Sequence, residues 1–313
     1  MLRPLRRKAV FTMVSRMLVR WKGRYTTVLV MLTVVVAAGA VRASPATAVE
    51  PTGDFAVFEQ CPRFTSGVEL CLYAETLTGE LVLDRESVPI SKALVVQGGL
   101  KINSETGAES LVGALNGETI VRTAEKVPGG LLGLVNCGTL PLLMAAACEA
   151  VLAGGATGVD AITELAKPAD DAEISTENLE EQVGVALGLP VKIRLENPLL
   201  GNDCYIGSAS SPVALDLTDS VTTPQPPNRP IHGTEGRISV KDNFQIVDVT
   251  NNTLVNNEFA APAAAGCGGP FAPVIDPIID ARIGLPAPDG FNTAIEHNFL
   301  QEGEASAVVA SER

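Results

Sequence analysis

The chain has 313 residues, of which 46% are hydrophobic and only 4% aromatic, and its formal net charge at pH 7 is −13. Residues 1–48 hold nine of the 23 basic residues and none of the 36 acidic ones, so residues 49–313 keep 14 basic residues against 36 acidic ones, a net charge of −22. A surface with this charge repels phosphate backbones and argues against nucleic acid as a partner.

Residues 1–48 are predicted to be a signal peptide. An arginine-rich stretch leads into 14 apolar residues at 28–41 and then into Ala-Thr-Ala at 46–48, which is typical of an export signal. The apolar run is shorter than the roughly 20 residues of a membrane-spanning helix. We therefore expect cleavage near Val49 and secretion to the extracellular space or the cell envelope. An uncleaved N-terminal membrane anchor is the alternative.

All six cysteines follow the predicted cleavage point, and an even number of cysteines in an exported chain predicts three disulfides. Six cysteines allow about 15 pairings. Sequence proximity favours the pairs Cys61–Cys71, Cys137–Cys148 and, by elimination only, Cys204–Cys267. The sequence contains no CxxC motif or Cys/His cluster, so we expect no metal site and no cofactor.

The middle pair constrains the local structure. If Thr139 caps a helix through the following apolar segment, Cys148 lies about 13 Å along that helix. Bridged Cα atoms are only about 4.4 to 6.8 Å apart. Either the chain doubles back at Cys137, or the helix begins later, or the pairing is wrong.

Hydrophobic periodicity predicts mostly strands before residue 127 and a helical segment after it. The expected elements are a strand in GVELCLYAET (67–76), a turn at Thr78-Gly79, a strand run in VPISKALVVQGGL (88–100), a polar connection at 104–116, a strand in ETIVRT (118–123) and a helical insertion at 130–165. The first part of the insertion overlaps a nearly charge-free segment, residues 127–155, which packs inside the protein or contacts a membrane or a partner.

Residues 167–181 are acidic and polar, and we expect an exposed loop there, with or without one helical turn. The later elements are expected to be strands in VKIRLEN (191–197) and SSPVALDLTDS (210–220), a proline-rich connector at 224–230, strands in GRISVKD (236–242) and FQIVDVTNNTLVNNEF (244–259) with an Asn-rich turn, a helix in DPIIDARIGLP (276–286), a strand in FNTAIEHNFL (291–300) and a flexible tail at 304–313. In the helix, Asp276 is expected as the cap, Pro277 as the first residue and Gly284 as the terminator.

The sequence carries no catalytic signature, and we name no catalytic residue. The string at 207–211, GSASS, lacks the last glycine of a nucleophile elbow. A Ser/His/acid triad would come together only in space, and only His232 and His297 are present to serve it. Asp276 and Asp280 lie one helical turn apart, but chance carboxylate pairs are expected among 36 acidic residues.

Several strings are familiar in combination: CPRFTSGVELCLYAET (61–76), VPGGLLG (127–133), ENPLLGNDCYIGS (196–208) and FAAPAAAGCGG (259–269). Together they resemble a group of exported actinobacterial proteins of uncharacterised function. The resemblance implies an exported, disulfide-bearing protein, and it implies no activity or site residue.

These observations favour one mainly β domain at residues 49–313, an antiparallel sandwich or partly closed barrel with a helical insertion, and α+β is the alternative. The function that fits best is a non-enzymatic structural or binding module of the extracellular space or cell envelope, with an envelope component or another protein as partner. One alternative is an envelope-directed hydrolase that uses carboxylates or a histidine. Another is a protein that contacts a membrane or partner through residues 127–155.

Overall fold

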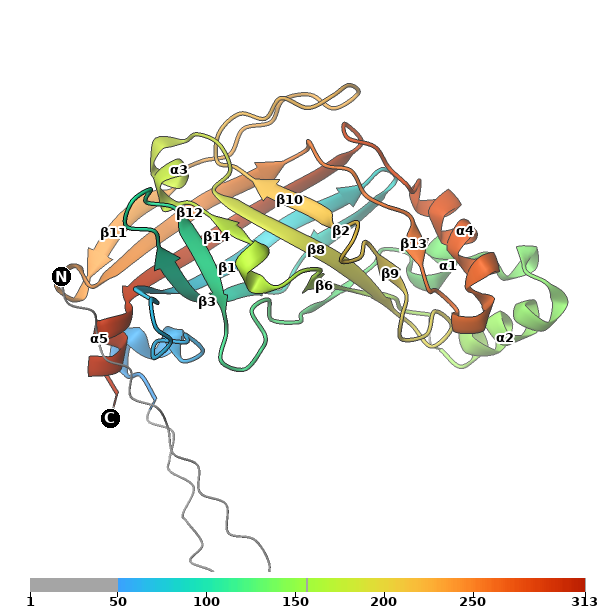
Figure 1. Ribbon diagram of the computed structural model, residues 1–313. Coiled ribbons are helices and arrows are strands. Elements are labelled where there is room, and N and C mark those ends of the chain that lie inside the picture. Colours follow the sequence, from blue (N-terminus) through green and yellow to red (C-terminus); the bar gives the residue numbers. More distant parts are fainter. Residues whose placement is uncertain (1–49, 156, 313) are drawn as a thin grey trace, which may run out of the picture. The chain divides into compact units, whose positions relative to one another are not determined.

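One large antiparallel sheet of 14 strands forms the framework of the protein (Figure 1). The structure, a computed structural model, describes residues 50–155 and 157–312. The predicted signal peptide at 1–48 lies outside the described residues. The mainly β prediction is confirmed, and the sheet is not closed into a barrel.

The strands and helices alternate irregularly along the chain. The strands are β1 (Leu70–Leu83), β2 (Glu86–Ile90), β3 (Leu94–Ile102), β4 (Glu109–Gly113), β5 (Ala124–Lys126), β6 (Asp160–Leu165), β7 (Glu173–Ile174), β8 (Leu187–Glu196), β9 (Tyr205–Ile206), β10 (Val213–Leu217), β11 (Arg237–Lys241), β12 (Ile246–Asn256), β13 (Ala264–Ala265) and β14 (Asn292–Glu304). The α-helices are α1 (Gly130–Leu134), α2 (Leu142–Ala153), α3 (Thr176–Glu181), α4 (Ala272–Ile283) and α5 (Ala305–Ala310). The short 3-10 helices are η1 (Gly53–Phe58), η2 (Cys137–Thr139), η3 (Ala169–Asp171), η4 (Asp242–Phe244) and η5 (Gly269–Phe271).

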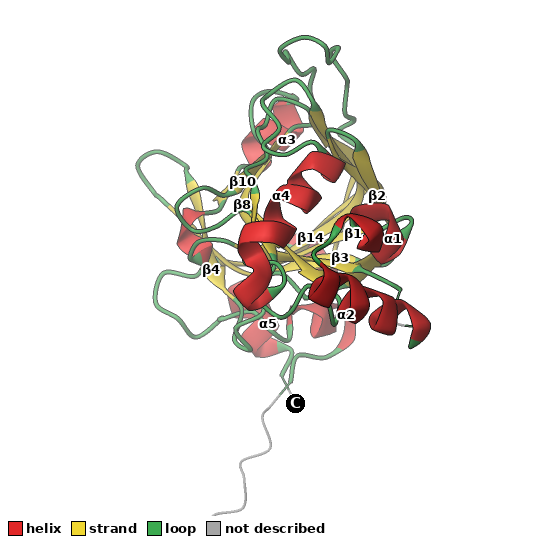
Figure 2. Cartoon of the chain, turned by 90° about the vertical axis from the view of Figure 1, so that its right-hand side faces the viewer, coloured by secondary structure: helices red, strands yellow, loops and turns green. Residues whose placement is uncertain are grey.

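The sheet bends around its own interior. Its main strand order is β11-β12-β14-β1-β3-β4-β7-β8-β6-β5, with β10 paired to β8 and β2 paired to β1. Thr218, just after β10, forms an isolated bridge with Val255 of β12, with N to O distances of 2.9 and 2.8 Å. Seen from the end that carries α1, α2 and α4, the strands curve around a central space and α4 lies in front of it (Figure 2). The main core fills this interior.

The strands of the main core show the alternation that the sequence predicts. In β8, Val191, Ile193 and Leu195 are buried while the residues between them are half-buried. In β10, Val213, Leu215 and Leu217 are buried and the residues between them are exposed. Successive side chains of a strand point to opposite faces, so each of these strands supplies one apolar face to the interior.

The first predicted turn is wrong. Thr78 and Gly79 lie inside β1, where the pairing with β14 shifts register between Thr76 and Thr78. A Cβ at Gly79 would lie 2.2 Å from the carbonyl oxygen of Ile295 and 3.2 Å from the Cα of Glu296. Glycine is present because the backbone of β14 comes this close.

Other boundaries before residue 127 also differ from the sequence prediction. The run at 88–100 is split between β2 and β3, and the expected connection at 104–116 contains β4. The expected strand at 118–123 is reduced to an isolated bridge between Ile120 and Val96. Short strands such as β4 carry too few alternating residues to be recognised from periodicity alone.

The helical insertion is shorter than residues 130–165, because α2 ends at Ala153 and β6 begins at Asp160. The conflict between the helix and the disulfide is resolved in two ways at once. The chain turns back at Cys137 through η2, and α2 begins only at Leu142. The Cα atoms of Cys137 and Cys148 are consequently 5.6 Å apart.

The prediction for the start of α4 is wrong, whereas its end is confirmed. The helix begins at Ala272, so Asp276 and Pro277 lie inside it. Asp276 does not cap the helix: its carboxylate accepts hydrogen bonds from the backbone N–H of Cys267 at 2.8 Å and of Gly266 at 3.1 Å. Gly284 follows the helix with a φ of 98°, the left-handed conformation in which a helix terminates.

The short helix α3 agrees with the helical turn allowed for residues 167–181, but the segment also contains η3 and β7 and is therefore more structured than the expected loop. The expected Asn-rich turn is also wrong. β12 runs on through it with a register shift between Val249 and Asn252, and Asn251 adopts a φ of 57°. The proline connector at 224–230 contains no helix or strand, as predicted.

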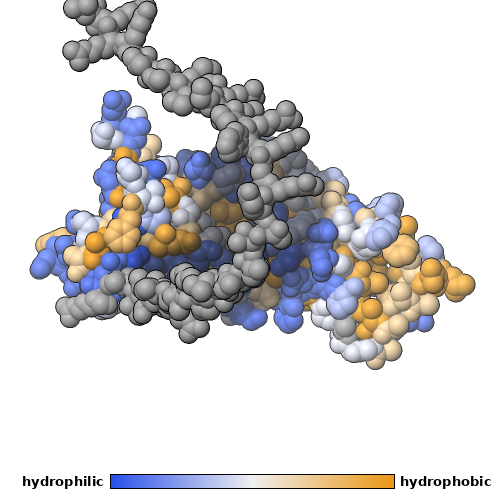
Figure 3. Space-filling model, turned by 60° about the horizontal axis from the view of Figure 1, so that its bottom comes forward, coloured by the Kyte–Doolittle hydropathy of each residue, from blue (hydrophilic) through white to orange (hydrophobic). Residues whose placement is uncertain are grey.

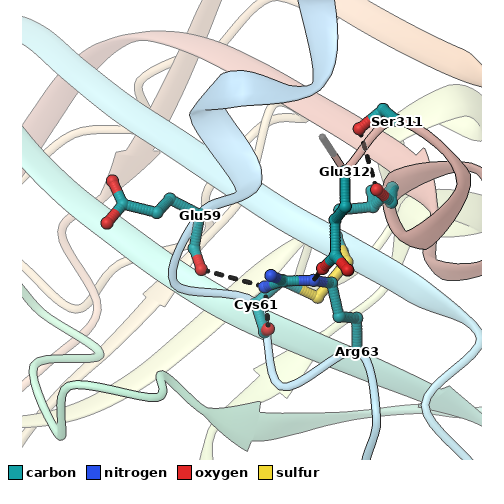
Figure 4. The surroundings of a disulfide bond; sticks show 7 residues. Glu59, Cys61, Arg63, Ser311 and Glu312 are labelled. Carbon is teal, nitrogen blue, oxygen red and sulfur yellow. Dashed lines mark hydrogen bonds and ion pairs between the residues drawn. A yellow bond between two sulfur atoms is a disulfide. The ribbon is translucent and has the colours of Figure 1, made fainter. Parts of the chain in front are cut away.

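Residues 305–310 of the expected flexible tail at 304–313 form helix α5, which packs beside η1 (Figure 1). Phe58, Ile246 and Val308 belong to a second apolar cluster separate from the main core. Arg63, close to the Cys61–Cys71 disulfide, forms an ion pair with Glu312, and its guanidinium also donates to the carbonyl oxygen of Glu59 at 3.1 Å (Figure 4). These contacts fix both ends of the described chain against each other.

The three predicted disulfide pairings are confirmed. The bonds are Cys61–Cys71, Cys137–Cys148 and Cys204–Cys267, with Cα separations of 5.4, 5.6 and 4.1 Å. Three disulfides are consistent with an extracellular protein. In the described part of the chain, no helix combines the length and hydropathy that crossing a bilayer requires.

Candidate functional site

The inner face of the sheet encloses an apolar cavity. The cavity has a volume of about 70 Å³, and the empty space is about 980 Å³ when the region open to solvent is included. The apolar lining residues are Leu81, Leu83, Val88, Ile90, Leu94, Ile120, Val127, Leu134, Ala161, Leu189, Val191, Ile193, Leu195, Ile206, Leu215, Ile283 and Ala294. Two threonines, Thr123 and Thr163, and four glutamates, Glu80, Glu86, Glu125 and Glu296, complete the lining.

The cavity follows from strand alternation and from the helices at one end. Val191, Leu215 and Ala294 come from β8, β10 and β14, whose inward side chains meet across the interior. Leu134 of α1 and Ile283 of α4 also line the cavity. These two helices lie at the end of the sheet that faces the viewer in Figure 2. Apolar side chains that reach the space from several directions make it suited to an apolar molecule.

Glu296 is the most deeply buried acid of the lining, with 4% of its surface exposed. It lies on the inner face of β14, two residues from Ala294. The Thr76 hydroxyl donates a hydrogen bond of 3.0 Å to Glu296 Oε2. Burial raises the pKa of Glu296 to about 7, and the Thr76 hydrogen bond opposes this shift. The group can therefore be neutral or ionised near neutral pH.

Glu125 joins two parts of the sheet that are distant in the strand order. From β5 its carboxylate accepts hydrogen bonds from the backbone N–H groups of Ser91 at 3.0 Å and Lys92 at 2.6 Å, and from the Ser91 hydroxyl at 2.7 Å. Ser91 and Lys92 follow β2, so this carboxylate holds the β2 and β5 sides of the cavity together. Its acceptor capacity is used by the protein itself.

Glu86 lies near the helical end of the cavity. Burial raises its pKa, and the positive charge of Arg282 on α4 opposes that shift. Glu80 is exposed and accepts a hydrogen bond from the Ser87 hydroxyl. Two of the four lining acids, Glu125 and Glu296, are buried. In the described part of the chain, the Glu125 carboxylate accepts three hydrogen bonds, whereas that of Glu296 accepts one, from Thr76.

A second buried acid, Glu302, lies on the same strand six residues from Glu296, about 20 Å away at the rise of a strand. Only 8% of its surface is exposed, and its Oε1 has no hydrogen-bond partner in the described chain. Burial raises its pKa to about 8, and the negative charges of Glu109 and Glu180 add to the shift. Glu302 is not part of the cavity lining.

The predicted candidates for catalysis lie elsewhere. His232 and His297 are both exposed; Nδ1 of His232 lies against the carbonyl oxygen of Gly233, and Nδ1 of His297 is hydrogen-bonded to the Thr253 hydroxyl. Neither histidine has a hydrogen bond to a serine or a carboxylate in the described residues. The histidine form of the hydrolase hypothesis therefore has no supporting geometry there.

The predicted carboxylate pair has a structural role. Asp276 binds two backbone N–H groups, and Asp280 accepts one from Ala264 at 2.8 Å. Both carboxylates hold α4 against the segment around β13. Among the described residues, no group of three or more His, Cys, Asp or Glu side chains is arranged to hold a metal ion.

Sequence reasoning missed Glu296. The segment FNTAIEHNFL predicts a strand, and Glu296 shares a face with Ala294 and Asn298, but the opposite face holds Ile295 and Phe299. Both faces are mixtures of apolar and polar residues, so periodicity does not tell which one faces the interior. A carboxylate two residues from a small apolar residue is the only local signal.

Comparisons with protein families, curated proteins and solved structures gave no match to the chain. The resemblance to exported actinobacterial proteins stays a prediction.

Proposed function

We propose that this protein is an exported, non-enzymatic binding module that holds a small apolar molecule in the cavity of its sheet. The observation that carries this proposal is the unfilled apolar space lined by Val191, Leu215, Ala294 and their neighbours. Protein interiors are normally packed as densely as organic crystals. At about 24 cal/mol per Å³, leaving 70 Å³ empty costs on the order of 2 kcal/mol. A bound apolar molecule recovers part of that cost.

Export is part of the same proposal. The acid-free leader at 1–48 and the three disulfides support it. The cavity also suits a binding role better than a hydrolytic one, because Glu125, Asp276 and Asp280 have their carboxylates bound to the backbone.

Filling the cavity is expected to abolish ligand binding. The substitution Ala294→Phe places an aromatic ring among the lining residues, and Ala161→Leu adds a branched aliphatic side chain from β6 on another wall. We expect the affinity for the dye N-phenyl-1-naphthylamine, measured by the rise in its fluorescence in an apolar site, to fall at least tenfold in both variants.

The matched control is Ala214→Phe, because Ala214 lies on β10 with its side chain exposed, beside the lining residue Leu215. It adds the same ring outside the cavity and is expected to leave dye affinity unchanged. The unfolding temperature of each variant shows that it is folded at the temperature of the assay. The proposal is refuted if the protein does not bind the dye, or if the folded Ala294→Phe and Ala161→Leu variants bind it as well as the native protein.

A second candidate function, contact with a lipid surface, is favoured by helix α2. The side chains of Leu142 and Leu143 are 90% and 77% exposed, and Glu149 is the only charged residue of the helix. Apolar residues gather at this end of the sheet, which carries α1, α2 and α4 (Figure 3). Contiguous exposed apolar residues of this kind mark interaction sites.

Removing the two leucines tests this second function. We expect the native protein to co-sediment with phosphatidylcholine vesicles and the variant Leu142→Ser/Leu143→Ser to lose most of that binding. Burying one leucine side chain in the lipid contributes about 1.5 to 3 kcal/mol of binding free energy. The control Leu77→Ser removes another exposed leucine, in β1, and is expected to have no effect. Equal sedimentation of the native protein and the double variant would exclude this role for α2.

A further inference from the structure

The ionisable groups of the cavity lining are all carboxylic acids. The lining includes the carboxylic acids Glu86, Glu125 and Glu296 and no lysine, arginine or histidine. Arg282 of α4 acts electrostatically on Glu86 but is not part of the lining. The lining thus offers acceptors and negative charge to a ligand, and no cationic partner for an anionic group.

Among the lining acids, Glu296 is the best placed to contact a ligand in the cavity. Only 4% of its surface is exposed, and its Oε2 accepts a hydrogen bond of 3.0 Å from the Thr76 hydroxyl. Glu125, in contrast, already accepts three hydrogen bonds from Ser91 and Lys92. A buried carboxylate that receives one hydrogen bond gains more from a donor that arrives with the ligand than one that already receives three, because burial has removed it from most of the bulk water.

We infer that the ligand is an amphiphile with an aliphatic chain and a protonated amine, and that the amine pairs with the carboxylate of Glu296 while the chain fills the apolar part of the cavity. This inference rests on the proposed binding function. The chain would contact residues such as Val191, Ile193 and Leu215. A fatty acid or a phosphate-bearing lipid would place a negative charge beside buried carboxylates, and like charges in a low dielectric repel strongly.

The inference distinguishes ligands that share one chain and differ only in the head group. Decylamine, decanol and decanoate are to be compared at pH 8 by displacement of N-phenyl-1-naphthylamine from the native protein. We expect decylamine to bind at least tenfold more tightly than decanoate, with decanol between them. In Glu296→Gln the advantage of decylamine over decanol is expected to disappear, while the affinity for decanol stays within about threefold of the native value.

A net charge of −22 also attracts amines to the surface, so the control changes a charge outside the cavity. Glu304 is the last residue of β14 and is exposed. Glu304→Gln removes the same charge from the same strand and is expected to keep the preference for decylamine. Surface attraction is screened within about 10 Å at 0.1 M salt. The preference should therefore persist when the comparison is repeated at 0.3 M sodium chloride.

The outcomes separate this inference from the proposed function. If decanol displaces the dye but decanoate binds as tightly as decylamine, the cavity is a binding site and the amine inference is wrong. The inference is equally wrong if Glu296→Gln keeps the full preference for decylamine. If none of the three compounds displaces the dye, the proposed binding function and the inference fail together.

Discussion

Raising the pH from 5 to 7 is expected to lower the free energy of unfolding by about 3 to 5 kcal/mol through two buried acids. Burial raises the pKa of Glu296 to about 7 and that of Glu302 to about 8, from a value of 4.5. Between these values the unfolded chain is ionised while the folded protein keeps both protons. Each group then reduces stability by about 1.4 kcal/mol per pH unit.

The sign follows from the raised pKa values. Below pH 4.5 both acids are protonated in the folded and unfolded states, so their favourable contribution is fully present. It is lost progressively as the pH rises through the folded pKa values of about 7 and about 8. Urea unfolding followed by far-UV circular dichroism at pH 5, 6 and 7 measures this slope.

Glutamine variants measure how much each of the two acids contributes to the change of unfolding free energy with pH. Glu296→Gln and Glu302→Gln stay neutral at every pH, so each is expected to remove about half of the slope and to be more stable than the native protein at pH 8. The exposed Glu304→Gln is expected to keep the native slope. A native protein whose stability is constant or rises between pH 5 and pH 7 would contradict the burial of these two acids.

The sequence predicts those strands in which one face is buried and the other is more exposed along the whole length. β8 and β10 each have one buried and one more exposed face, so alternation identifies Val191, Ile193 and Leu215 as interior residues. The three disulfides are equally accessible to sequence reasoning, because two of them join cysteines only 10 and 11 residues apart. Once these are assigned, the last pair follows.

The site is not predictable in the same way because it depends on contacts between distant segments. Glu125 binds backbone groups more than 30 residues earlier, and Glu296 binds Thr76, 220 residues away. Local rules assign Asp276 to a helix cap, but its carboxylate is used by the backbone of Gly266 and Cys267. Tertiary contacts override the local preference in each case.

Removing the Cys204–Cys267 disulfide is expected to lower the free energy of unfolding by about 4 kcal/mol, because it closes a loop of 63 residues and restricts the unfolded chain. The bond also holds a wall of the cavity. Cys204 precedes β9, which pairs with β13, and Cys267 is bound through its N–H to Asp276 of α4. The variant Cys204→Ala/Cys267→Ala frees α4, whose Ile283 lines the cavity, so dye binding should weaken at least tenfold.

The matched control is Cys61→Ala/Cys71→Ala. This bond closes a much shorter loop beside the second apolar cluster, away from the cavity lining, and its loss is expected to cost about 3 kcal/mol. Because Arg63 and Glu312 still connect the two ends of the described chain, we expect dye affinity to stay within about threefold of the native value. Urea unfolding gives the stabilities, and dye titration at a temperature where both variants are folded gives the affinities. Equal losses of affinity in the two variants would show that the disulfides act on binding only through global stability, and that α4 is not held over the cavity by Cys204 and Cys267.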